Sequence, residues 1–272
     1  MYKLLYNPLS RSKKGKKSLE EVKSYLKSDF EEINLLDIED YKKLFDSFNE
    51  EDVIVVIGGD GTLSKFINNI GEVKQKLLFY SGGTGNDFLR NFDDVLVEYT
   101  DVDKPVFTFG NSKAKFLNGF GIGVDAEVAI KYDKKKHNNS LTYAISALSA
   151  FLTYKSSDVD ITVDGTNYSF KGAWLVAVQN GKYFGAGMKV TPHAKVNDGL
   201  LDVIVVHNVN RFKLMYHFLK VYSGKHIKLE DIFFYKQGSS IEIKSSKPVF
   251  YQTDGELSQE KYTEFKVDVN ER

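Results

Sequence analysis

Apolar residues follow two different patterns along the first part of the chain. Residues 52–57 (DVIVVI) form a continuous run rich in β-branched side chains, which is typical of a strand buried on both faces of a parallel sheet. Residues 16–28 instead carry apolar side chains at helical spacing. Strands that alternate with helices predict a parallel sheet with helices on both sides. The predicted strands are 2–6, 33–38, 52–57 and 77–80, and the predicted helices are 16–28, 38–48 and 62–70.

Beyond residue 100 strand-like runs dominate and few helices interrupt them. We therefore expect an α/β protein of two lobes. The first, residues 1–100, is expected to have a Rossmann-like parallel sheet with helices, and the second, residues 101–272, is expected to be an antiparallel β-rich sandwich. Its predicted strands are 106–109, 115–120, 160–163, 173–178, 201–206, 241–243, 248–252 and 265–269, with helices near 141–154 and 211–220.

Charge and composition exclude several classes of protein. The chain has 37 basic and 37 acidic residues, whereas nucleic-acid-binding proteins usually carry a basic excess, so no nucleic-acid partner is expected. No cysteine is present, which excludes disulfides and cysteine nucleophiles. The longest apolar stretch, 141–154, is too short to span a bilayer. We expect a soluble, cytoplasmic protein, and any membrane contact is expected to be peripheral.

A glycine-rich loop at 58–62 (GGDGT) follows the predicted strand 52–57 and precedes a predicted helix. Glycines let the backbone turn and let a phosphate approach the N–H groups closely. The start of the helix adds N–H donors and a positive dipole end. Asp60 would repel a phosphate, so we expect it to orient a metal-bound water, a hydroxyl or a neighbouring N–H. A tight turn capped at Thr62 is the alternative, but the position after a buried strand favours a phosphate site.

Two further loops extend this pattern. Residues 81–88 (SGGTGNDF) follow the next predicted strand and are expected to precede a helix. Residues 7–10 (NPLS) follow the first strand, with Arg11, Lys13 and Lys14 close behind. Ligands of such sheets bind beyond the carboxyl ends of the strands, so adjacent glycine-rich loops predict a cradle for a polyphosphate. For any single one of the nearby cations, a solvated loop position is the simpler interpretation.

These motifs, together with 118–128 (NGFGIGVDAEV) and 253–256 (TDGE), resemble the catalytic domain shared by diacylglycerol kinases, sphingosine and ceramide kinases and related bacterial lipid kinases. The resemblance covers nearly the whole chain. The GGDGT loop also occurs in NAD kinases and phosphofructokinases, so the GTGND loop and the C-terminal DGE point to lipid kinases. The resemblance implies that ATP binds between two lobes and that the lipid substrate is met at the membrane surface. It also implies contact with anionic phospholipid headgroups, and it suggests a homodimer.

The resemblance also implies the binding sites for ATP and Mg²⁺. A structural magnesium ion is expected at Lys195, Asp198 and Leu200, with Asp198 supplying its carboxylate and the other two their backbone carbonyls; Mg²⁺ prefers such oxygen ligands. A second Mg²⁺ is expected to arrive with ATP. The residues expected to contact ATP are Asn7, Pro8, Leu9, Ser10, Arg11, Gly58, Gly59, Asp60, Gly61, Thr62, Leu63, Ser64, Gly83, Thr84 and Asn86.

By the same resemblance, Asp254 and Glu256 match the catalytic carboxylates. Residues i and i+2 of a strand point to the same face, so both are expected to reach one substrate. A kinase that acts on an alcohol needs a base to accept the hydroxyl proton. The residues by themselves leave open which carboxylate is the base, and an Asp-Gly pair is also a common hairpin turn.

The sequence departs from the family pattern at several positions. Ser64 and Lys65 stand where the family usually has Asn and Glu, and Arg11 stands where a glycine is common. Asn197 replaces a frequent Asp, which removes one charge near the expected metal and could weaken it. Asp125 is expected to cap a helix, and the resemblance places it near the acceptor site.

Residues 131–137 form the sharpest charge cluster, KYDKKKH. It is either a solvated loop or a contact with anionic lipid headgroups, and a lipid-kinase function favours the contact.

The sequence thus predicts an ATP-dependent kinase that phosphorylates the free hydroxyl of diacylglycerol to give phosphatidic acid. One alternative is a kinase for another lipid, such as a sphingoid base. Another is a nucleotide-binding regulator without catalysis, although such a protein has no chemical need to retain Asp60, Asp198, Asp254 and Glu256 together.

Overall fold

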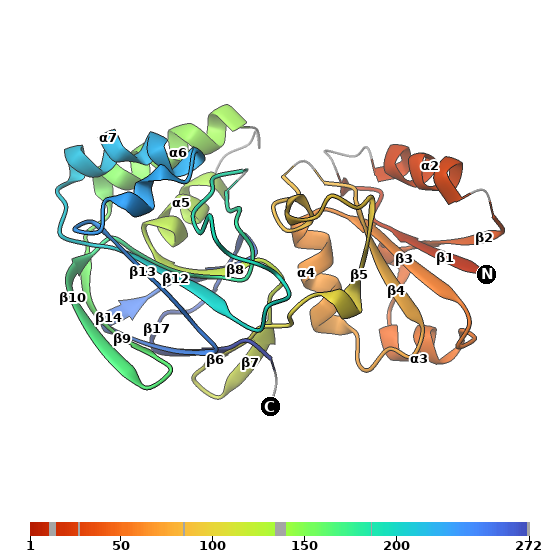
Figure 1. Ribbon diagram of the computed structural model, residues 1–272. Coiled ribbons are helices and arrows are strands. Elements are labelled where there is room, and N and C mark those ends of the chain that lie inside the picture. Colours follow the sequence, from red (N-terminus) through yellow and green to blue (C-terminus); the bar gives the residue numbers. More distant parts are fainter. Residues whose placement is uncertain (11–14, 27, 84, 134–139, 186, 271–272) are drawn as a thin grey trace. The chain divides into compact units, whose positions relative to one another are not determined.

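The computed structural model describes residues 1–10, 15–26, 28–83, 85–133, 140–185 and 187–270. The chain divides into two compact units, Met1–Val102 and Asp103–Arg272 (Figure 1). This division lies two residues beyond the boundary that the sequence pattern suggests.

The first unit is built on a five-stranded sheet with the order β2-β1-β3-β4-β5. The first four strands of this order are parallel, and β5 pairs with β4 in the antiparallel direction. The strands are β1 (Tyr2–Tyr6), β2 (Phe30–Asn34), β3 (Val53–Gly58), β4 (Lys76–Ser81) and β5 (Leu96–Glu98), and the α-helices are α2 (Gly15–Leu26), α3 (Tyr41–Asp46) and α4 (Asp60–Asn69).

Helices cover both faces of this sheet, which explains the continuous apolar run of β3. On one face, Leu19 and Val22 of α2 pack with Val55 and Ile57. On the other face, Phe66 of α4 makes an edge-on ring contact with Phe79 of β4 and a tilted one with Phe45 of α3. A strand between two helical layers buries both of its faces, so the expected parallel α/β unit is confirmed.

Several helices and strands of the first unit have boundaries that differ from the predicted ones. The strand predicted at 33–38 occupies Phe30–Asn34, and Asn34 then caps a short 3₁₀ turn, η1 (Leu35–Asp37), by accepting a hydrogen bond from the N–H of Leu36. The helix predicted at 38–48 is only α3, because the Asp40 side chain caps it at its start. In the described residues that follow the second glycine-rich loop, a 3₁₀ turn, η2 (Leu89–Asn91), takes the place of the expected α-helix. A further 3₁₀ turn, η3, spans Tyr99–Asp101.

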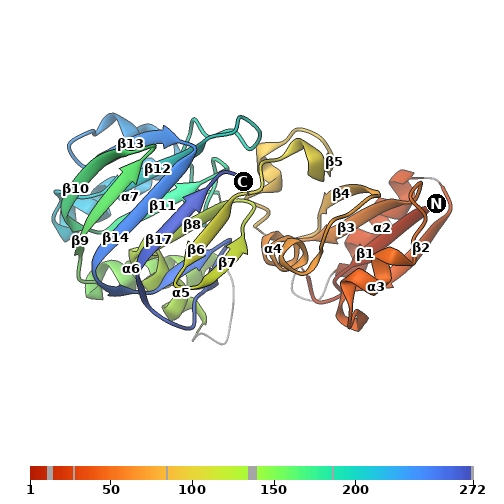
Figure 2. The same cartoon turned by 90° about the horizontal axis from the view of Figure 1, so that it is seen from below.

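The second unit is a sandwich of two six-stranded sheets (Figure 2). The β9 sheet has the order β10-β9-β14-β17-β6-β7, and the β11 sheet has the order β13-β12-β11-β8-β15-β16. The strands are β6 (Val106–Phe109), β7 (Ser112–Lys115), β8 (Gly119–Gly123), β9 (Ser157–Val163), β10 (Thr166–Ala173), β11 (Leu175–Gln179), β12 (Leu201–Val206), β13 (Phe233–Gly238), β14 (Ser240–Val249), β15 (Tyr251–Thr253), β16 (Glu256–Leu257) and β17 (Tyr262–Asp268).

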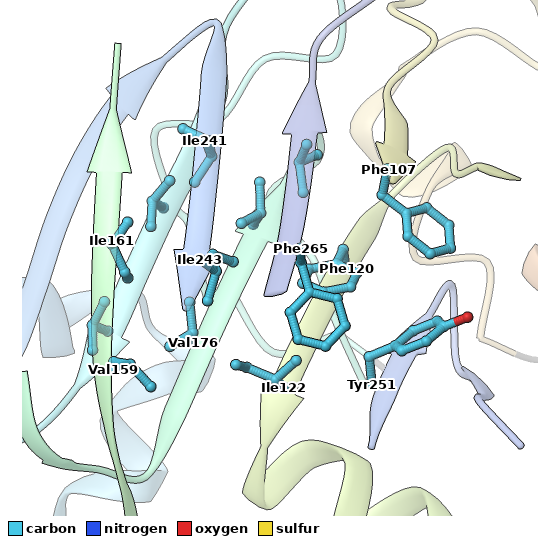
Figure 3. Close-up of a cluster of buried hydrophobic side chains, with 14 of the residues drawn as sticks. Phe107, Phe120, Ile122, Val159, Ile161, Val176, Ile241, Ile243, Tyr251 and Phe265 are labelled. Atoms are coloured by element: carbon cyan, nitrogen blue, oxygen red, sulfur yellow. The ribbon is translucent and has the colours of Figure 1, made fainter. Parts of the chain in front are cut away.

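The core of the sandwich lies between the two sheets (Figure 3). Val159 and Ile161 of β9 face Val176 and Ile122 of the β11 sheet across this core. Alternate residues of β9 point inward and outward, which is the pattern of a sheet with one open face.

The β11 sheet is covered on its second face as well. All six residues of β12 are buried, because the helices α5 (Val124–Asp133), α6 (Ser140–Thr153) and α7 (Arg211–Tyr222) pack over that face through a second apolar cluster. A 3₁₀ turn, η4 (Lys225–Lys228), follows α7. Among the residues that the structure describes, no helix is both long and apolar enough to cross a membrane.

Two strand predictions in this unit merge elements that the structure separates. Residues 115–120 contain the end of β7 and the start of β8, and 173–178 contain the end of β10 and most of β11. At the first break, backbone N–H groups of residues 117–119 donate to the side chain of Asp254 rather than to a neighbouring strand.

Candidate active site

The two glycine-rich loops of the first unit touch backbone to backbone. A Cβ atom on Gly83 would lie 2.4 Å from the Cα of Gly59, and one on Gly59 would lie 2.7 Å from the Cα of Gly83. The N–H of Gly82 donates a hydrogen bond of 2.7 Å to the carbonyl of Gly58. Only glycine permits this approach, since any side chain would push the two loops apart.

The side chain of Asp60 links the two loops by hydrogen bonds. Its Oδ2 accepts a hydrogen bond from the N–H of Asp87, and its Oδ1 accepts one from the N–H of Phe88, both at 3.0 Å. Of the roles expected for Asp60, orientation of neighbouring N–H groups is the one that the structure shows. Asn86 completes the second loop: its φ of 50° is left-handed, and its side chain exchanges two hydrogen bonds with the backbone of Gly83.

The loop after β1, residues 7–10, contacts the same cluster through Thr62 of the loop after β3. The Asn7 amide donates to the Thr62 hydroxyl at 3.2 Å, and the Ser10 hydroxyl lies 3.3 Å from it. Asn7 also accepts a hydrogen bond from the N–H of Leu9. The three loops that the sequence singled out therefore meet at the carboxyl ends of β1, β3 and β4.

The expected ATP residues are not equivalent in this arrangement. The helix α4 begins at Asp60, with Gly59 as its cap and no side chain bonded there, so its N-terminal N–H groups point toward the loops. The side chains of Leu63 and Ser64 are buried, and the N–H of Leu63 donates to the carbonyl of Gly59, so the structure does not show these two residues open to a ligand. Arg11 and Thr84 lie outside the described residues.

In the second unit the Asp-Gly-Glu motif forms a hairpin turn between β15 and β16. Asp254 and Gly255 both have left-handed backbones, with φ of 49° and 86°. The expectation that Asp254 and Glu256 point the same way from one strand is therefore wrong, because the chain reverses between them. The hairpin alternative describes the local geometry.

The Asp254 carboxylate lies against a row of backbone donors. It accepts hydrogen bonds from the N–H groups of Leu117, Asn118 and Gly119 at 2.9, 2.9 and 3.0 Å. Its own N–H donates to the carbonyl of Gly119. Asp254 thus fixes the hairpin to the start of β8, whereas Glu256 is exposed at the first position of β16.

A buried polar connection runs from this hairpin to Asp125. The Gln252 amide donates to Asp125 Oδ2 at 3.1 Å, and its Oε1 accepts from the N–H of Gly255 at 3.0 Å. Burial raises the pKa of Asp125 to about 6, although the bonds from Gln252 and Ala126 work against this. Asp125 lies within the first turn of α5 rather than at its cap.

Asp125 also lines an apolar cavity beneath the three helices. Its volume is about 70 Å³ for the centre of a water-sized sphere; since one water takes about 10–15 Å³ on this measure, several methylene groups fit. Among the described residues, Asp125 and His226 are the only titratable side chains that line it. The other lining residues are Val124, Val128, Ala147, Phe151, Trp174, Leu175, Phe184, Met188, Val190, Ile204, Val206, Leu214, Phe218, Val221 and Phe233.

His226 is fully buried beside this cavity. Its Nε2 lies 2.9 Å from the carbonyl of Val190 and donates to it, and its Nδ1 has no hydrogen-bond partner among the described residues. Burial lowers the pKa of His226, so the imidazole is neutral and Nδ1 can accept a hydrogen bond from a ligand hydroxyl.

The loop expected to hold magnesium is anchored by Asp103. The N–H of Gly199 donates to Asp103 Oδ2 at 2.9 Å, and the N–H of Asp103 donates to the carbonyl of Val196 at 2.7 Å. Asp198 is exposed, and one of its oxygens accepts the N–H of Leu200 at 3.1 Å. An exposed carboxylate in a loop that also offers backbone carbonyls fits a hydrated Mg²⁺. Within the described part of the chain, no three His, Cys, Asp or Glu side chains form a metal-binding group.

A second carboxylate, Asp202, lies buried close to this loop. Burial, reinforced by the negative charge of Asp198, raises the pKa of Asp202 to about 7, while Gln237 lowers it. The Tyr235 hydroxyl also donates to Asp202. A nearby cation would stabilise the charged form of this carboxylate, which is consistent with a metal at the loop.

Sequence reasoning missed Asp103, Gln252 and His226. Asp103 carries no motif, and its role arises from a contact far along the chain. Gln252 directly precedes the Thr253-Asp254-Gly255-Glu256 run, so its position was the one available signal.

Comparison with known proteins places the chain in a family. Residues 1–104 match the model of the diacylglycerol kinase catalytic domain. Residues 119–268 match the model of the YegS C-terminal NAD kinase beta sandwich-like domain. These two matches define a lipid-kinase class of protein.

Individual relatives agree with that class. A Bacillus subtilis protein named "Putative lipid kinase YtlR" is 28% identical over 228 residues, which cover 75% of this chain and 74% of that protein. A diacylglycerol kinase of Staphylococcus carnosus is 26% identical over 274 residues, 93% of this chain and 88% of the relative. A crystal structure from Bacillus anthracis, described as a putative diacylglycerol kinase, matches with a TM-score of 0.69 and 26% identity over 98% of this chain and 93% of its own.

The chain belongs to the diacylglycerol kinase catalytic-domain family, as its motifs predicted. It is a lipid kinase at the level of this family.

Proposed function

We propose that this chain transfers the γ-phosphoryl group of ATP to the free hydroxyl of diacylglycerol, giving phosphatidic acid and ADP. The observation that carries the proposal is the apolar cavity of the second unit, whose described lining residues include two titratable groups, Asp125 and His226. An acyl chain would occupy such a surface through the hydrophobic effect, and a few polar groups would orient the hydroxyl end. Relatives named diacylglycerol kinase support the same substrate.

The loop cluster of the first unit is suited to the polyphosphate. Backbone N–H groups at the start of α4, together with the glycine-rich loops, would hold the negative charge of the phosphates. The tie between Asp60 and the second loop keeps these donors in place before ATP binds. Preorganised donors need no rearrangement when charge develops in the transition state.

We assign the base to Glu256 and a positioning role to Asp254. Three backbone N–H groups already occupy the Asp254 carboxylate, whereas Glu256 is solvent-exposed on the same hairpin. In the reaction the lipid hydroxyl oxygen bonds to the γ-phosphorus, the bond from that phosphorus to the β,γ-bridging oxygen breaks, and Glu256 takes the hydroxyl proton. The leaving group is ADP.

Magnesium would be held by the carboxylate of Asp198 and the backbone carbonyls of Lys195 and Leu200. A magnesium ion, when bound, supplies positive charge that stabilises the anionic groups around it. The anchoring of this loop by Asp103 keeps the carbonyls in a fixed arrangement.

The buried carboxylate of Asp125 favours one second candidate. A sphingoid base carries an ammonium group, and a cation next to Asp125 would offset the cost of burying a charged carboxylate. Diacylglycerol has no such cation. A lipid panel therefore separates the two substrates.

The test is phosphoryl transfer from labelled ATP to a panel of lipids in anionic mixed micelles. Wild type is compared with Glu256→Gln and Asp254→Asn. The proposal is supported if wild type labels diacylglycerol and Glu256→Gln does not. Labelling of a sphingoid base alone replaces the substrate, and ATP binding with no labelled lipid favours the regulator.

A further inference from the structure

The helices α6 and α7 are apolar on both of their faces. Among the described residues of the second unit, every exposed large apolar side chain lies on one of these two helices. Phe212, Tyr216 and Leu219 of α7 are 78%, 73% and 74% exposed. The others are Ile145, Leu148 and Leu152 on α6 and Tyr222 at the end of α7.

Helical spacing gathers these side chains into stripes. Residues 212, 216 and 219 of α7 follow each other one turn apart, on the side opposite the buried Leu214 and Val221. Residues 145, 148 and 152 of α6 do the same. The helices lie next to each other over the β11 sheet, joined by the edge-on contact of Phe151 with Phe218 (Figure 1).

The inner faces of the same helices line the apolar cavity. Ala147 and Phe151 of α6 and Leu214, Phe218 and Val221 of α7 are among its lining residues. A helix that is apolar all round normally lies inside a protein or in lipid. Here one side packs on the protein, and the other side has no covering element among the described residues.

The charged residues of α7 and η4 all have one sign. Neither α6, α7 nor the following η4 contains Asp or Glu. Lys213 and Lys220 flank the α7 stripe, and the exposed Lys225 and Lys228 follow its C-terminal end. An apolar face bordered by cations is the arrangement of helices that lie in the interface of an anionic bilayer. A symmetric pair of copies would instead place these cations opposite one another.

We propose that the outer faces of α6 and α7 form a docking surface for an anionic lipid bilayer, here called the α6–α7 face. Phe212, Tyr216 and Leu219 enter the boundary between headgroups and acyl chains, and Lys213 and Lys220 bind the phosphates beside them. A lipid leaving the bilayer at this face meets the helices that cover the cavity. The inference deepens the proposed function, because it assigns the place where the lipid substrate enters.

The test is sedimentation with vesicles of 70% phosphatidylcholine and 30% phosphatidylglycerol. The variants are Phe212→Ser with Leu219→Ser, and Lys213→Glu with Lys220→Glu. A control, Leu36→Ser with Val95→Ser, removes two exposed apolar side chains from the first unit, where they are 54% and 50% exposed. We expect each α6–α7 pair to weaken vesicle binding by at least about tenfold, and the control pair to leave it unchanged.

A second assay separates docking from catalysis. With a short-chain diacylglycerol dispersed as monomers, the α6–α7 variants should keep the wild-type rate, while phosphorylation of bilayer-embedded substrate falls with vesicle binding. Unchanged vesicle binding in both α6–α7 variants overturns the proposal. The proposal is also overturned if wild type is a dimer and the α6–α7 variants are monomers, because the face then binds a second copy of the chain. If the α6–α7 variants lose vesicle binding but wild type phosphorylates no diacylglycerol, the docking surface is supported and the proposed substrate is rejected.

Discussion

The carboxylate of Asp60 accepts a hydrogen bond from the backbone N–H of Phe88 at 3.0 Å, and the two residues lie 28 positions apart in the chain. With the parallel bond from Asp87, this contact ties the loop after β3 to the loop after β4. The arrangement turns two separate strand-to-loop junctions into one rigid cluster, and its consequences can be measured.

Replacement of Asp60 by Ala should weaken both folding and ATP binding. Two charge-assisted hydrogen bonds are lost, each worth about 1.5–3 kcal/mol, so the free energy of unfolding should fall by roughly 3–6 kcal/mol. Denaturant unfolding and calorimetric ATP titration measure the two effects. Asp46→Ala, which removes an exposed partner of Lys42 in the same unit, is the control and should change stability by less than about 1 kcal/mol. Equal effects of the two substitutions would contradict the role of Asp60.

Gly83→Ala should disrupt the contact between the glycine-rich loops. The new Cβ would lie 2.4 Å from the Cα of Gly59, so the backbone must move, at a cost of about 1–3 kcal/mol. Gly71→Ala is the matched control, because nothing lies within 4 Å of its added Cβ. We expect ATP affinity to fall in Gly83→Ala alone. An unchanged affinity would show that the close approach is not needed for nucleotide binding.

Substitution of the two carboxylates of the DGE hairpin should affect different properties, kcat for Glu256 and the free energy of unfolding for Asp254. Glu256→Gln should lower kcat by about 10²–10⁴-fold and leave the unfolding curve unchanged, as expected for loss of a general base. Asp254→Asn should lower the free energy of unfolding by about 1–3 kcal/mol, because its carboxylate accepts three backbone N–H groups. Steady-state kinetics with denaturant unfolding of both variants distinguishes these results. The reverse pattern would exchange the two roles.

Asp125 should make stability depend on pH. Its pKa is raised by burial from 3.8 to about 6 in the folded chain, so the folded state favours the protonated form. The stabilisation is complete below about pH 4 and is lost as the pH rises through about 6, by an amount on the order of 2–3 kcal/mol. Denaturant unfolding between pH 4 and 8 should show a smaller loss of stability in Asp125→Asn than in wild type, because Asp202, whose pKa is raised to about 7, contributes over an overlapping range in both chains. A step of the same size in both chains would assign it to another group.

Local patterns predicted much of the first unit. The β-branched run of β3 and the glycines after it fix a buried strand followed by a tight turn, because these properties depend on neighbouring residues only. The second glycine-rich loop was placed correctly, but the helix expected after it was not. There Asp60, a residue distant in sequence, binds the N–H groups of Asp87 and Phe88, and only a 3₁₀ turn follows.

The sequence by itself determined the alternation of elements, the antiparallel character of the second unit and the family of the chain, since each follows from periodicity or from short motifs. Only the tertiary structure decided that Asp254 binds backbone N–H groups while Glu256 is exposed, and that Gln252 links their hairpin to Asp125. It also decided that α6 and α7 close an apolar cavity on one side and expose apolar side chains on the other. These relationships join residues far apart in the chain, and their geometry is set by packing and burial, which no local pattern encodes.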